Sequence, residues 1–305
     1  MIEDYPVYLH TLKSGKFEQK LKKARSVLSS CRVCPRNCGA NRLKGEKGEC
    51  GTAYEPVVSS HFPHFGEEAP LVGRRGSGTI FIGGCNLRCL FCQNYSISHL
   101  LNGSPVSIRH FAEIMLEVQA MGCHNINIVT PSHIVPQLIE AVKIAAEGGL
   151  RIPLVYNSGG YDSLLSLRLL EGIVDIYMPD FKFYSDQLGE RYTAVSDYGA
   201  VARDAVREMF RQAGDLVVKN GIAVRGLLVR HLVMPGMLED SGKIFHFLAD
   251  EISANTYLNV MSQYRPAGEA WLRPEIDMRL GWDEYQQARQ AARDAGLRRL
   301  DNRLL

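Results

Sequence analysis

Three cysteines in a short segment could hold an iron–sulfur cluster. Cys85, Cys89 and Cys92 are separated by three and then two residues. Such clusters are held by cysteine thiolates, usually four of them. No fourth cysteine lies close in the sequence, so one iron would stay open to an outside ligand such as the amine and carboxylate of a small molecule. A zinc site would need four closed ligands, with His99 as a weak fourth candidate, so the spacing predicts a 4Fe–4S cluster.

A second group of cysteines lies upstream and has four members: Cys31, Cys34, Cys38 and Cys50. Four thiolates complete a site without an outside ligand, and both a closed zinc site and an auxiliary 4Fe–4S cluster satisfy that count. The surrounding segment has few apolar residues, so a metal would supply order that a core cannot. Reduced, unligated thiols are the third alternative. The remaining cysteine, Cys123, is expected to pack as a small buried side chain.

The elements that position the three-cysteine loop begin at residue 79. Short apolar runs rich in β-branched residues alternate with longer segments of helical periodicity, which predicts parallel βα units whose strands are buried on both faces. Six strands are predicted, at 79–84, 126–130, 152–157, 174–178, 224–230 and 257–262. Helical segments are predicted at 111–122, 134–149, 204–214 and 243–252. Periodicity alone allows either a partial barrel or an open doubly wound sheet.

Polar and glycine residues follow each predicted strand. Ligands of parallel sheets bind at the carboxyl ends of the strands, where these residues would meet. They are Cys85 and the residues at 130–133, 157–160, 179–182, 230–231 and 262–265. This pattern favours an active site at that edge of the sheet.

These motifs resemble those of the radical S-adenosylmethionine enzymes. GSGTIFIGGCNLRCLFCQN is similar to the branch that contains the pyruvate formate-lyase activating enzymes and their uncharacterised relatives, as are CRVCPRNCGANRLKGEKGECG and HFGEEAPL upstream. The resemblance runs from about residue 31 to the sixth strand. It implies a partial (β/α)6 TIM-like barrel, with residues 1–78 as an N-terminal helix and cysteine-rich lead-in. Residues 79–305 would form the radical core and a C-terminal helix.

The resemblance also implies the chemistry. The open iron would bind the amino and carboxylate groups of S-adenosylmethionine. One electron, from a donor such as flavodoxin or ferredoxin, would cleave the cofactor to a 5′-deoxyadenosyl radical that abstracts hydrogen. The partner would be a glycyl-radical protein; the alternatives are a small molecule or a peptide as substrate. A non-enzymatic iron–sulfur electron carrier is the rival from another class, and it has no need of a polar pocket.

Cofactor-binding roles are implied at positions that match the family. Phe91 stands where the family has an aromatic near the adenine. Thr130 stands where many members have a Gly-Gly-Glu segment that contacts the methionyl amine, which leaves backbone carbonyls for this contact. Gln263 would approach the adenine or the substrate.

Four further positions would bind the polar parts of the cofactor. Asn157 would reach the ribose or the amino-acid end. Asp180 and Lys182 resemble an Asp-x-Lys pair in which the lysine binds the cofactor carboxylate, and Arg230 resembles a basic residue near that carboxylate.

The composition sets the remaining expectations. The chain has 305 residues and a net charge of +2, which gives no case for nucleic acid or an anionic membrane as a partner. The first residues lack the apolar region of a secretory signal, and no run approaches the ~20 apolar residues of a membrane span. A cytoplasmic protein is predicted. His61 and His64 are expected in a loop, with an acid or ligand role as the alternative.

Overall fold

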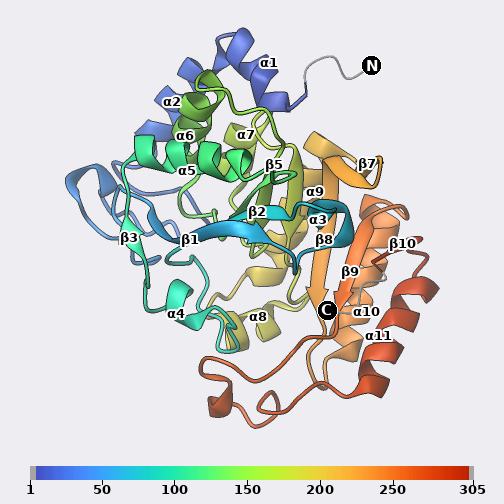
Figure 1. Ribbon diagram of the computed structural model, residues 1–305. Coiled ribbons are helices and arrows are strands. Elements are labelled where there is room, and N and C mark those ends of the chain that lie inside the picture. Colours follow the sequence, from blue (N-terminus) through green and yellow to red (C-terminus); the bar gives the residue numbers. More distant parts are fainter. Residues whose placement is uncertain (1–4, 302–305) are drawn as a thin grey trace.

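The computed structural model describes residues 5–301 and contains one large, mostly parallel sheet (Figure 1). Six parallel strands neighbour one another in chain order: β2 (Ser77–Ile82), β4 (Ile126–Val129), β5 (Leu154–Ser158), β6 (Ile176–Pro179), β8 (Ile222–Leu232) and β9 (Tyr257–Met261). A doubly wound sheet would reverse this order at a switch point. Sequential order with right-handed crossovers instead winds the strands in one direction, as in a barrel. The predicted partial barrel is confirmed.

Further strands flank this array. On one side β1 (Val57–His64) pairs antiparallel with β2, and β3 (Ser104–Pro105) pairs with β1. On the other side β10 (Arg299–Leu300) pairs with β9, while β7 (Val217–Lys219) forms a hairpin with β8. Within the part of the chain that the structure describes, the two outer strands do not pair, so the barrel stays open.

Helices connect the strands and pack around them (Figure 1). The main ones are α5 (Ile108–Ala120), α6 (Val135–Glu147), α7 (Leu164–Leu170), α8 (Asp186–Thr193), α9 (Tyr198–Ala213), α10 (Leu238–Phe247) and α11 (Trp282–Asp294). Shorter or terminal ones are α1 (Val7–Lys13), α2 (Lys16–Ser26), α3 (Ala69–Val72), α4 (Tyr95–Ser98), the 3-10 turns Arg42–Lys44 and Ala270–Leu272, and the π-helical turn Leu248–Ile252. Both α1 and α2 contact α6. None of the helices in residues 5–301 has the length and apolar content to span a membrane.

The sheet buries apolar residues on both faces. One small cluster includes Leu71 of α3 together with Val155, Ile176 and Leu228 of neighbouring strands. The much larger cluster packs the alternate strand residues against the helices. Because side chains alternate along a strand, the small cluster marks the inner face of the barrel, which α3 covers.

The strand β1 was not predicted, because its residues lay in a segment expected to be loop-rich. Only Val57 and Val58 are buried in it, and Pro63 interrupts the pattern with a residue that lacks an N–H group. Its partner β2 supplies the order: Val58 pairs with Ile82 and His64 with Ser77. This long-range pairing leaves no periodic trace in the segment.

Candidate active site

Strand alternation places three polar side chains on the inner face at the carboxyl ends of the strands. Val155 and Leu228 belong to the inner cluster, and Asn157 and Arg230 follow each of them by two residues. Asp180 follows β6 and forms a parallel bridge with Arg230. Residues two apart on a strand share a face, so all three side chains meet above the apolar interior.

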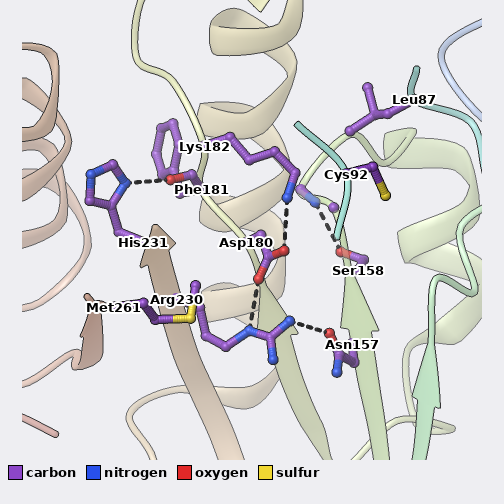
Figure 2. A network of polar contacts seen from close by, with 12 residues as sticks. Leu87, Cys92, Asn157, Ser158, Asp180, Phe181, Lys182, Arg230, His231 and Met261 are labelled. Atoms are coloured by element: carbon purple, nitrogen blue, oxygen red, sulfur yellow. Dashed lines mark hydrogen bonds and ion pairs between the residues drawn. The ribbon is translucent and has the colours of Figure 1, made fainter. Parts of the chain in front are cut away.

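These side chains form one hydrogen-bonded network around Asp180 (Figure 2). The Asp180 carboxylate accepts from Lys182 Nζ at 2.8 Å and from Arg230 Nε at 2.7 Å. Arg230 Nη2 donates to Asn157 Oδ1 at 2.7 Å. All three charged side chains are at most about a fifth exposed. The network therefore holds two cations in place with one carboxylate.

Electrostatics keep all three groups charged. Burial alone would raise the pKa of Asp180, but Arg230 and Lys182 lower it to about 2. Burial alone would lower the pKa of Lys182, but Asp180 raises it well above its ordinary value. Lys182 and Arg230 are therefore held as cations, and a cation at this site can bind a carboxylate ligand.

The three-cysteine loop follows β2 and is anchored by its backbone. The amides of Arg88 and Leu90 donate to the carbonyls of Thr193 and Tyr192 at the end of α8, at 3.1 and 3.0 Å. Burial raises the pKa of Cys85 to about 11 and that of Cys89 further. These thiols would therefore be protonated at neutral pH unless a metal displaced the protons.

The loop and the network line the same cavity of about 360 Å³. Its lining includes every residue predicted for the cluster and the cofactor: Cys85, Cys89, Phe91, Cys92, Thr130, Asn157, Asp180, Lys182, Arg230 and Gln263. Three thiols beside a carboxylate-binding pair of cations fit a cluster with one open iron and an amino-acid ligand. The individual roles of these residues remain predictions.

Acidic residues from the HFGEEAPL segment also line this cavity, and sequence reasoning gave them no role. Glu67 Oε2 lies 3.4 Å from Arg230 Nη1, and Glu67 Oε1 lies 3.0 Å from His64 Nδ1. Glu68 is buried and accepts from Asn259 at 2.8 Å through Oε1. Two adjacent glutamates before a short apolar run were the available signal, but only the pairing of β1 with β2 brings them to the strand ends.

The upstream cysteines lie outside this cavity, in the loop between α2 and β1. That loop contacts the three-cysteine loop: Arg36 Nε donates to the Asn86 carbonyl at 2.8 Å, and Arg88 Nη2 donates to the Glu49 carbonyl at 2.9 Å. Across residues 5–301, no three Cys, His, Asp or Glu side chains converge on the position of a single metal ion. None of the eight cysteines forms a disulfide.

A buried histidine behind the network predicts sensitivity to acid. One ring nitrogen of His231 lies 2.7 Å from the Phe181 carbonyl oxygen (Figure 2), and the other lies 2.8 Å from the Ser241 hydroxyl. Burial lowers the pKa of His231 from 6.5 to about 4. Between these values the unfolded chain binds a proton that the folded protein excludes. The free energy of unfolding should therefore fall by up to about 3 kcal/mol as the pH drops from about 6.5 to about 4.

His231→Gln should remove this part of the acid sensitivity, measured by urea unfolding at several pH values across that range. His246→Gln is the matched control, since His246 is exposed on α10. Equal pH dependence in wild type and His231→Gln would contradict the prediction.

Comparisons with known proteins bear on the family of this chain. The model of the Radical SAM superfamily matches residues 79–248, which include the three-cysteine loop and strands β4 to β8. The uncharacterised protein MJ0674 of Methanocaldococcus jannaschii is 32% identical over 294 residues, covering 93% of this chain and 80% of the relative. A second uncharacterised protein of that organism, MJ0808, is 25% identical over 262 residues, covering 77% of this chain and 70% of the relative.

Among solved structures, SuiB of Streptococcus suis bound to S-adenosylmethionine has a TM-score of 0.47 at 10% identity. It covers 69% of this chain, which spans only 44% of the SuiB chain. The same protein bound to its precursor peptide SuiA gives a TM-score of 0.46 at 11% identity, covering 69% of this chain and 43% of that one. The family match extends over more than half of the 305 residues and takes in the cysteine loop, so this chain belongs to the Radical SAM superfamily.

Proposed function

We propose that this chain holds a 4Fe–4S cluster on Cys85, Cys89 and Cys92 and cleaves S-adenosylmethionine reductively to activate a protein partner. The observation that carries the proposal is the shared cavity: three thiols and two inner-face cations line one space. When bound, the cluster supplies the electron that splits the cofactor into methionine and a 5′-deoxyadenosyl radical. An outside donor such as flavodoxin or ferredoxin must supply that electron.

The residues of the chain would bind and orient the cofactor. Lys182 and Arg230 offer positive charge to its carboxylate, and Asp180 fixes their positions. Asn157 accepts from Arg230, which leaves its amide nitrogen for a ribose or carboxylate oxygen. Phe91 is buried against Phe183, with ring centroids 5.9 Å apart, and offers an apolar contact for the adenine.

A protein substrate is supported by the surface beside the cysteine loop. Gly268 and Glu269 contact this loop, and the Glu269 amide donates to the Leu90 carbonyl at 2.7 Å. Trp271 lies two residues after Glu269 and is 66% exposed. Large exposed aromatic side chains are typical of protein contact surfaces. Together with the resemblance to activating enzymes, this surface favours a glycyl-radical protein as the partner.

The test is anaerobic reconstitution with iron and sulfide, followed by incubation with S-adenosylmethionine and dithionite. Release of 5′-deoxyadenosine is expected. A cluster-loaded protein that releases none would contradict the proposal and leave electron transfer as the function. For the activating role, a candidate glycyl-radical protein should gain a radical signal in electron paramagnetic resonance. Consumption of a small molecule without that signal would favour the alternative substrate class.

Lys182→Met should weaken binding of S-adenosylmethionine. A charged hydrogen bond contributes about 1.5–3 kcal/mol, so the dissociation constant should rise roughly 10- to 100-fold. Binding would be measured by equilibrium dialysis on the reconstituted protein, with iron content checked in parallel. Lys243→Met is the control, because Lys243 is half-exposed and pairs with Glu239 on α10. Unchanged affinity in Lys182→Met would show that Lys182 does not bind the cofactor.

A further inference from the structure

A fully buried cation lies in the upstream cysteine loop. Arg42 is 0% exposed. Its guanidinium donates to the carbonyls of Ala53 at 2.8 Å and His133 at 2.5 Å, and to the Thr52 hydroxyl at 3.1 Å. All three acceptors are neutral. Among residues 5–301, Arg42 forms no ion pair with a carboxylate, and a buried charge without a partner costs several kcal/mol.

Two cysteine sulfurs that can become negative lie near Arg42. Arg42 interacts electrostatically with Cys31, which is buried at 4% exposed. The Thr52 hydroxyl that accepts from Arg42 lies 3.1 Å from Cys50 Sγ. The arginine therefore lies near Cys31 and is linked to Cys50 through the Thr52 hydroxyl.

The other two cysteines lie within the same small volume. A Cβ atom added to Gly48 would lie 3.0 Å from Cys38 Sγ and 3.6 Å from Cys50 Sγ, so both sulfurs face this glycine. Cys34 interacts electrostatically with the other three thiols and is buried, at 7% exposed. Residues from 31 to 50 thus bring four sulfurs together, with little room for a side chain at position 48.

We propose that Cys31, Cys34, Cys38 and Cys50 bind a second metal centre as four thiolates, whose net negative charge is balanced by buried Arg42. The shared chemistry is four-thiolate ligation. Zinc would have to draw together sulfurs that do not converge on one ion here, whereas each thiolate of a 4Fe–4S cluster binds a different iron. Each thiol loses its proton to solvent as its sulfur bonds to the metal, so a centre releases four protons per chain. Without metal, the four neutral thiols would leave the arginine charge uncompensated.

This centre would order the three-cysteine loop as well as the upstream cysteine loop. Arg36 and Arg88 join the two cysteine loops through backbone carbonyls. Gly84 directly precedes Cys85 and has a φ of +83°; a Cβ there would lie 2.6 Å from the Cys50 carbonyl oxygen. Only glycine permits both this conformation and this close approach. Order in the upstream loop therefore helps to fix where the three-cysteine loop begins.

The test begins with the full-length Cys85→Ala/Cys89→Ala/Cys92→Ala variant, purified anaerobically and reconstituted separately with zinc and with iron plus sulfide. About one zinc, or about four irons and four sulfides, should remain bound per chain after desalting. Adding Cys34→Ser and Cys38→Ser should abolish this retention. Either metal supports the proposal and identifies the centre. Absence of both, or undiminished metal after the two serine substitutions, overturns it.

A second measurement does not depend on the folding of those variants. In the wild-type protein, mass spectrometry after brief alkylation should find the four upstream cysteines protected, and a chelator should expose them together. Immediate alkylation of all four without chelator would overturn the proposal. Arg42→Met should lower metal retention at a fixed chelator concentration, and Arg42→Lys should restore part of it by restoring the charge. Equal retention in all three proteins would exclude Arg42 as the balancing charge.

Discussion

Cys89→Ala is expected to abolish release of 5′-deoxyadenosine from S-adenosylmethionine. Cys89 is the middle cysteine of the loop and is only 8% exposed. The variant would keep only two thiolates of this cavity, those of Cys85 and Cys92, for a cluster that normally has three or four. The rate should fall at least ~1,000-fold, which corresponds to about 4 kcal/mol. Chromatographic assay of the reconstituted protein measures it, together with iron and sulfide content.

Cys123→Ala is the matched control. Cys123 is also buried, at 4% exposed, but it precedes β4 and packs in the large apolar cluster. Removing its sulfur should cost about 1 kcal/mol of folding stability and leave cofactor cleavage intact. Cleavage retained in Cys89→Ala would show that the cleaving cluster is held elsewhere. Cleavage lost in both variants at normal iron content would show that the loss is not specific to Cys89.

The parts of the site that could be predicted from the sequence are those that depend on local pattern. Apolar runs with helical segments between them identify the parallel strands, and the geometry of such sheets brings their carboxyl ends together. Asn157, Lys182 and Arg230 could therefore be assigned to one site before any coordinates. The cysteine spacing added the loop that follows β2.

Contacts that depend on pairing between distant segments could not be predicted. Glu67 and Glu68 reach the cavity only because β1 pairs antiparallel with β2, and β1 has little alternation of its own. The burial of Arg42 depends on contacts with His133, which lies 91 residues away. In sequence Arg42 is one of many basic residues; its importance comes from the lack of an ion pair with a carboxylate within residues 5–301.

The Asp180 network is expected to contribute strongly to stability as well as to cofactor binding. Asp180→Asn would leave Lys182 and Arg230 facing a neutral amide while both remain largely buried. Removing one partner of a buried ion pair costs about 3–5 kcal/mol. Because Asp180 is about a fifth exposed, we expect the lower end of that range, about 3 kcal/mol, in urea unfolding at neutral pH.

The pH dependence and a compensating variant separate this effect from simple loss of packing. The folded pKa of Asp180 is about 2, against an ordinary value of 3.8. The stability that Asp180 contributes is therefore complete above about pH 4 and is lost as the pH falls toward 2, so wild type and Asp180→Asn should have similar stability there.

Asp180→Asn/Lys182→Met removes one charge of each sign and should recover stability, because Arg230 keeps its contacts with Glu67 and Asn157. The double variant should still bind S-adenosylmethionine poorly, because it lacks the lysine proposed to bind the cofactor carboxylate. If the two variants lose the same free energy of unfolding, Lys182 is not destabilised by the loss of Asp180, and water rather than Asp180 solvates these cations.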